Sequence, residues 1–98
     1  MLLSKDELKI LEELTQIFGP SGDEGLVRDY LKRHYHDLGL ETYEDNLGSI
    51  IALKKSKNPN AKKVLLVAHM DEVGFMVSKI LSNGAVMVLP LGGHNPQA

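Results

Sequence analysis

The sequence of 98 residues has no cysteine and no tryptophan, and only 5% of its residues are aromatic. Without cysteine there can be no disulfide framework and no thiolate zinc site. No apolar run approaches the ~18 residues needed to span a bilayer, and residues 1–7 lack the basic and apolar regions of a signal peptide. Neither positive nor negative charge is in large excess, because the net charge is −2. We therefore expect a cytoplasmic protein with neither a nucleic acid nor a membrane as partner.

Length and the order of segments predict one small α/β unit. A chain of this size suits a single domain, although it buries only about 60–65% of its unfolded surface. We expect two N-terminal helices packed on a small mixed sheet.

Two segments near the start have the apolar spacing of amphipathic helices. In the first, Ser4 followed by Glu7 is a capping-box signature, and Gly-Pro at 19–20 ends the helix. The signature recurs at 21–24, and Gly39 ends the second helix. We read residues 19–22 as a tight turn rather than as an anion-binding loop. The expected apolar faces are Leu8, Leu11, Leu14, Ile17 and Phe18 in the first helix, and Val27, Tyr30, Leu31, His34 and Leu38 in the second.

Short strands are predicted for the rest of the chain, separated by turn residues. The segment 64–68 is entirely apolar and rich in Val and Leu, which is typical of a strand buried on both faces. Ser-Asn-Gly at 82–84 predicts the turn of a hairpin. The predicted strands are residues 40–43, 49–54, 64–68, 75–80 and 85–89.

Directly after residue 68 the chain presents His69, Asp71 and Glu72. Ligands gather at the carboxyl ends of strands in open α/β sheets, and side chains two apart in an extended chain leave on the same side. An imidazole is a common metal ligand and needs a further group to fix its tautomer. Asp71 could be that group or a ligand itself. The alternative is an ordinary strand end, where His69 caps backbone groups and both acids are solvated.

Four motifs in the same order resemble the glutamyl-aminopeptidase family of cocatalytic metallopeptidases. Residues 68–77 resemble its first metal motif, and 21–24 its Ser-Gly-x-Glu helix start. Residues 45–50 resemble its Asp-x-Leu-Gly-x-Ile turn, and 91–97 the point where an inserted domain begins. Members form dodecameric, tetrahedron-shaped assemblies, and some carry the label endoglucanase or cellulase M. The resemblance covers essentially the whole chain.

The resemblance implies removal of N-terminal residues, with acidic ones as candidates, from a peptide substrate. The chemistry would use two divalent ions, zinc or cobalt, a bridging water and a glutamate base, because paired metals activate water and polarise the carbonyl. In that scheme His69 binds one ion, and Asp71 holds the imidazole of His69 by a hydrogen bond. A homo-oligomer is implied as well.

Family members are several times longer than this chain. The resemblance therefore makes residues 1–98 an N-terminal piece of a catalytic domain, with 90–98 starting an inserted domain. The other ligands and the base would lie downstream, so the piece alone is expected to be inactive. His94 stands where many relatives have an aromatic residue, and we do not count it as a ligand. The role of Glu72 stays open.

Two other functions compete with this hypothesis. A non-enzymatic, truncated module could self-associate through an exposed sheet. A reading frame that continues past residue 98 would favour the peptidase, and a native stop codon there would favour the module. A glycosidase needs two facing carboxyl groups about 5–10 Å apart, and no such pair stands out, so it ranks last.

Overall fold

The computed structural model describes residues 2–96, in which two helices precede two antiparallel strand pairs. The predicted α/β class is confirmed, and the strands form two separate hairpins, β1–β2 and β3–β4. The helices are α1 (Lys5–Gln16) and α2 (Gly25–Asp37), and the strands are β1 (Glu41–Glu44), β2 (Ile50–Leu53), β3 (Gly74–Ile80) and β4 (Val86–Leu91).

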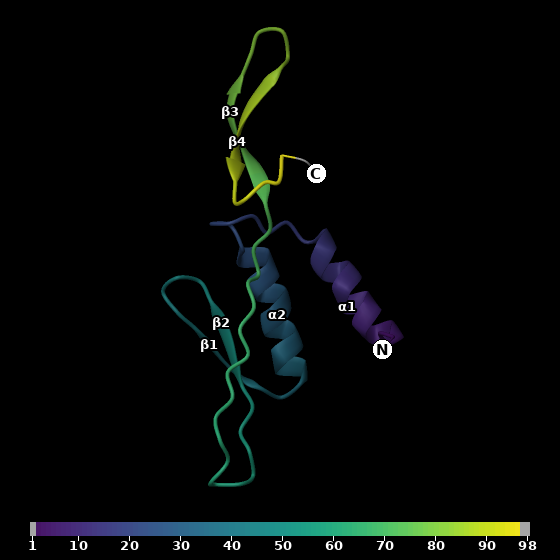
Figure 1. Cartoon of the computed structure of the whole chain (residues 1–98), viewed down its shortest axis with the longest axis vertical. Helices are drawn as coiled ribbons and strands as arrows, with labels where there is room; N and C mark the ends of the chain where they lie inside the picture. Colours follow the sequence, from purple (N-terminus) through teal and green to yellow (C-terminus); the bar gives the residue numbers. More distant parts are fainter. Residues whose placement is uncertain (1, 97–98) are drawn as a thin grey trace.

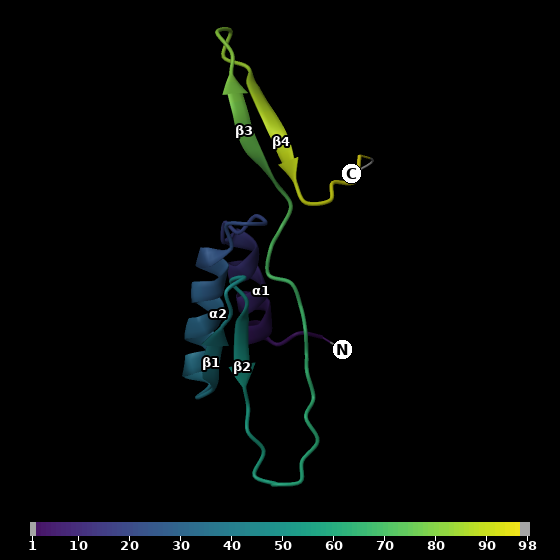
Figure 2. The ribbon, with the colours of Figure 1, turned by 90° about the vertical axis from the view of Figure 1, so that its left-hand side faces the viewer.

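The elements are spread along one long axis. The β3–β4 hairpin projects away from the helices at one end, and the connection that leaves β2 loops around at the other end (Figures 1 and 2). The described chain measures 65 × 35 × 25 Å and has a radius of gyration of 18.2 Å, against about 13 Å for a compact domain of 100 residues. These residues do not close around a single core.

The predicted capping box at the start of α1 is confirmed. The hydroxyl of Ser4 accepts a hydrogen bond from the Glu7 backbone N–H at 3.2 Å. The Glu7 carboxylate in turn accepts one from the Ser4 N–H at 2.7 Å, and these bonds lower the pKa of Glu7.

The second predicted capping box is wrong. Helix α2 begins at Gly25 with Glu24 as its N-cap, and no side chain caps it. A turn closed by the Asp23 N–H on the Pro20 carbonyl, at 2.9 Å, delays the start of the helix. Ser21 therefore lies too early to cap, and the Glu24 carboxylate accepts the Gly22 N–H at 2.7 Å instead. The prediction of a tight turn over 19–22 is confirmed.

Helix α2 holds α1 through one polar contact. The Tyr30 hydroxyl donates a hydrogen bond of 2.7 Å to the Glu13 carboxylate. This bond lowers the pKa of Glu13 and raises that of Tyr30. Apart from this contact α1 is thinly attached, because none of its residues is buried. Its predicted apolar face is only partly covered, because Leu8, Leu11 and Phe18 are exposed whereas Leu14 and Ile17 are half-buried.

The same helix carries the β1–β2 hairpin. Glu44 pairs with Lys32 at 2.6 Å and with Arg28 at 3.7 Å, and Lys32 lowers the pKa of Glu44. Within the hairpin turn, the Asp45 carboxylate accepts the Ser49 N–H at 2.8 Å, which lowers the pKa of Asp45. At the end of the helix Gly39 has a φ of 71°, a conformation that favours glycine and confirms the predicted stop.

The buried centre of the described chain is small. Gly19, Pro20, Val27 and Tyr30 are its buried residues, and Val27 and Tyr30 are the buried hydrophobic side chains. This centre lies where the α1–α2 turn meets the first half of α2. Among residues 2–96 it is therefore the one place that is packed tightly.

The prediction of a buried strand at 64–68 is wrong. These residues form no strand, and the side chains from Val64 to Val67 are 82–91% exposed. They belong to a long irregular connection that leads from β2 to β3 (Figure 1). A strand needs a neighbour to take its backbone hydrogen bonds, and no strand of the described residues pairs with this segment. The apolar pattern indicates that burial of this segment would be favourable, but it does not provide the partner residues that would bury it.

The β3–β4 hairpin has the predicted turn, closed by the Leu81 N–H on the Ala85 carbonyl at 2.8 Å. A register shift between Val77 and Lys79 marks a β-bulge. Most of its large apolar side chains are exposed, including Phe75 and Ile80. No helix within residues 2–96 is long and apolar enough to cross a membrane.

We expect the isolated 98-residue chain to self-associate as its concentration rises. Burying apolar surface is worth about 25 cal/mol per Å², so leaving 200–300 Å² uncovered costs on the order of 5–7 kcal/mol, comparable to the stability of a small domain. The exposed segment 64–67 and the β3–β4 hairpin are the surfaces to cover. Sedimentation velocity measures this, and a single well-folded monomer over a wide concentration range would contradict it.

Candidate metal-binding site

His69 and Asp71 lie in contact at the end of the irregular connection. The Nδ1 atom of His69 is 3.1 Å from the Oδ1 atom of Asp71 and 3.0 Å from the Asp71 backbone oxygen. The two side chains therefore meet on one side of the chain, as the spacing predicts.

The contacts of His69 define its tautomer. Both partners of Nδ1 are acceptors, so Nδ1 carries the hydrogen and donates it. In the neutral ring the lone pair then resides on Nε2. The His69 side chain is 84% exposed and that of Asp71 36%. This leaves Nε2 open to an approaching ligand. Histidines that bind a metal ion through one ring nitrogen typically donate the hydrogen of the other nitrogen to a carboxylate, and His69 has this arrangement.

A backbone hydrogen bond fastens this motif to the α1–α2 turn. The Glu72 N–H donates to the Gly19 carbonyl at 2.9 Å, and Pro20 and Glu72 form an isolated parallel bridge. The contact joins positions more than fifty residues apart. Nothing in the local sequence indicates such a pairing, so it is not predictable from the sequence. Glu72 contributes its backbone N–H here.

His94 is occupied by structural contacts. Its Nε2 lies 3.0 Å from the Gly74 carbonyl and 3.1 Å from the Leu91 carbonyl, so this nitrogen donates. The ring stacks on Phe75 with centroids 4.6 Å apart. The imidazole of His94 thus stacks as an aromatic side chain would at this position. Its hydrogen bonds connect the end of β4 to the start of β3.

The two histidines of α2 face different partners. His34 stacks on Tyr30 with centroids 4.6 Å apart, whereas Nε2 of His36 lies 2.9 Å from the Thr42 hydroxyl. They do not share a site, as their spacing of two on a helix predicts.

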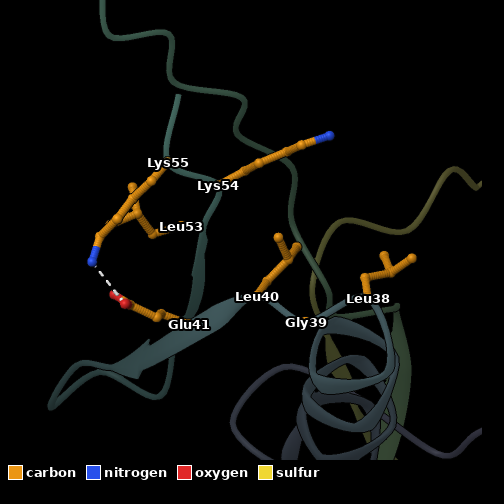
Figure 3. A pocket seen from close by; sticks show the side chains of 7 residues that line it. All are labelled: Leu38, Gly39, Leu40, Glu41, Leu53, Lys54 and Lys55. Atoms are coloured by element: carbon orange, nitrogen blue, oxygen red, sulfur yellow. Dashed lines mark hydrogen bonds and ion pairs between the residues drawn. The ribbon is translucent and has the colours of Figure 1, made fainter. Parts of the chain in front are cut away.

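Two surface hollows lie away from His69 and Asp71. One of about 310 Å³ lies beyond the C-terminal end of α2, where Leu40 and Leu53 form apolar walls and Lys55 pairs with Glu41 at 2.7 Å. Lys54 points away from this pair (Figure 3). A second hollow, between α1 and α2, is lined by Ile17, Tyr30, Gln16 and four charged side chains. His69 and Asp71 line neither of them.

The donor set around His69 is incomplete. In the part of the chain that the structure describes, no group of three or more His, Cys, Asp or Glu side chains could hold a metal ion. Catalytic zinc sites typically use three protein ligands. The pair fits one ligand and its orienting partner, and a working site needs further ligands.

Comparison with known proteins points in one direction. The family model of the M42 glutamyl aminopeptidases matches residues 48–98. The glutamyl aminopeptidase of Lactococcus lactis subsp. cremoris is 51% identical over 86 residues, which cover 88% of this chain and 24% of that protein. The lysyl aminopeptidase of Pyrococcus furiosus is 36% identical over 90 residues, which cover 91% of this chain and 25% of that protein.

A solved structure agrees with these sequence matches. The crystal structure of an endoglucanase from Thermotoga maritima has a TM-score of 0.76 and 50% identity, over 89% of this chain and 28% of that one. The chain therefore spans about a quarter of the length of the curated relatives it matches. With more than half of its residues matched by the family model, this chain belongs to the M42 glutamyl aminopeptidase family.

Proposed function

We propose that this chain forms the N-terminal part of the catalytic domain of a metal-dependent aminopeptidase. Its task there is to present His69 as a ligand to one of two divalent ions, with Asp71 as the positioning residue for the ring. The observation that carries the proposal is the contact of His69 Nδ1 with the Asp71 carboxylate, which leaves Nε2 exposed in a member of a family of aminopeptidases.

The division of work between the two residues follows from their chemistry. A carboxylate that accepts the Nδ1 hydrogen raises the basicity of the imidazole and stops the ring from rotating. His69 is then ready to bind without reorganising. When bound, divalent ions such as zinc or cobalt polarise the peptide carbonyl and make water a stronger nucleophile at neutral pH.

The rest of the site is proposed to come from the part of the family fold that this chain does not span. One imidazole and one carboxylate do not make a catalytic metal site. Peptide N-termini are the proposed substrates, and a homo-oligomer is the proposed assembly. A non-enzymatic module that self-associates is the second candidate, and the exposure of Val64 to Val67 and of the β3–β4 hairpin favours it.

A hybrid protein tests the proposed function directly. The 86 aligned residues of the Lactococcus lactis enzyme are replaced by those of this chain. We expect the hybrid to hydrolyse aminoacyl anilides, to lose activity on chelation and to regain it with zinc or cobalt. Asp71→Ala should lower kcat/KM about 10–100-fold, and His69→Ala should lower it further.

His36→Ala is the matched control, since His36 contacts Thr42 away from the motif, and it should leave the hybrid's activity unchanged. A folded, metal-loaded hybrid whose activity survives His69→Ala would overturn the proposed role of this histidine.

The 98-residue chain on its own should behave as an incomplete site. We expect no turnover of aminoacyl anilides with or without zinc or cobalt, because the described residues hold too few ligands. Zinc should bind at micromolar levels or more weakly, where binding free energies are about −8 kcal/mol or smaller in magnitude. Calorimetry that finds a stoichiometric nanomolar site in a monomer would contradict this expectation.

The orienting role of Asp71 is testable without catalysis. In the neutral form of the ring, the ¹⁵N shifts of His69 should report hydrogen on Nδ1, because both Nδ1 partners are acceptors. Asp71→Ala should move the ring toward a mixture of tautomers, whereas Glu72→Gln should leave it unchanged. An unaltered Nδ1–H tautomer in Asp71→Ala would show that the carboxylate does not orient the ring.

A further inference from the structure

We infer that Gly19 is a positioning residue for the metal motif, and that the α1–α2 turn acts as the platform on which His69 and Asp71 are presented. The inference rests on the proposed function for its catalytic meaning. The contact itself is a property of the described residues.

The platform has two faces. On the motif side, the Gly19 carbonyl accepts the Glu72 N–H at 2.9 Å. Beside it, a Cβ placed on Gly74 would lie 3.2 Å from the Cβ of Pro20, so the two backbones approach closely. The Gly19-Pro20 pair thus touches the residue directly after Asp71 and the first residue of β3.

On the helix side the platform rests on Val27. This side chain is 6% exposed and is one of the two buried hydrophobic residues. A Cβ on Gly19 would overlap Cγ2 of Val27. Valine in a helix has one strongly preferred rotamer, so rotating the Val27 side chain aside is unfavourable. Any side chain at position 19 must therefore push the turn away from α2.

The consequence for the motif follows from the hydrogen bond. The segment before His69 is exposed and forms no strand, so it cannot hold the motif in place. His69 and Asp71 are connected to the packed centre of the molecule through Glu72 and the Gly19 carbonyl. Displacing Gly19 releases the motif, although residue 19 touches neither His69 nor Asp71.

Substitutions in the 98-residue chain test the platform, at concentrations low enough for sedimentation velocity to find a monomer. Gly19→Ala should speed hydrogen exchange at the Glu72 amide at least about fivefold, since one backbone hydrogen bond is worth roughly that factor. It should also move His69 toward mixed tautomers. The double variant Gly19→Ala/Val27→Ala removes the Val27 methyl groups and should restore both readouts.

Gly25→Ala is the matched control, because a Cβ there meets only the end of Arg28 at 3.8 Å, and neither readout should change. If Gly19→Ala loses its helical circular dichroism signal and therefore does not fold, Gly74→Ala is used to test the platform instead. It presses on Pro20 from the motif side, outside both helices, and should also speed exchange at Glu72.

Unchanged exchange at Glu72 in a folded Gly19→Ala or Gly74→Ala chain would overturn the platform. Faster exchange with an unchanged His69 tautomer would overturn its positioning role. Both measurements are independent of peptidase activity. An inactive hybrid together with the predicted exchange pattern would therefore count against the proposed function and leave the platform standing.

Discussion

The close approach of Gly19 to Val27 is the packing contact on which the position of the α1–α2 turn, and through it that of His69 and Asp71, depends. It lets the α1–α2 turn lie directly on α2, with Gly19, Pro20, Val27 and Tyr30 as the buried residues of the described chain. This packing positions the Gly19 carbonyl, which accepts a hydrogen bond from the Glu72 N–H. Through that bond, a motif at the end of an exposed and irregular segment acquires a defined position relative to the helices.

Helix α2 also connects this packed centre to α1 and to the β1–β2 hairpin. It holds α1 through the bond from Tyr30 to Glu13 and the β1–β2 hairpin through Lys32 and Glu44. Ion pairs near the surface, such as that of Lys32 with Glu44, contribute little to stability individually, and the bond from Tyr30 to Glu13 is only partly buried. The described elements are therefore well defined in local geometry but weakly joined, which agrees with a radius of gyration of 18.2 Å.

Several structural features that depend only on neighbouring residues were predicted correctly from patterns in the sequence. The capping box at Ser4, the stop at Gly39 and the turn at 82–84 each depend on neighbouring residues, and each is present. The contact of His69 with Asp71 also follows from a spacing of two. Ser21 failed as a cap because a turn at Pro20 shifts the helix start.

Longer-range features were not predictable in this way. The segment 64–68 has the composition of a buried strand, but burial needs partners from elsewhere, and the described residues provide none. The bond between Gly19 and Glu72 joins distant positions, and no periodicity indicates it. Composition thus predicts which surfaces prefer to be covered, and only the three-dimensional arrangement shows whether they are.

The family and the incomplete ligand set together define what this chain contributes. It belongs to the M42 glutamyl aminopeptidases and spans about a quarter of their length, and its described residues offer one oriented imidazole. The most direct test is anomalous diffraction at the zinc edge from crystals of the hybrid protein. The account predicts a zinc peak about 2.0–2.1 Å from Nε2 of His69, with Nδ1 still on the Asp71 carboxylate. Zinc bound in the hybrid while Nε2 of His69 faces solvent would contradict it.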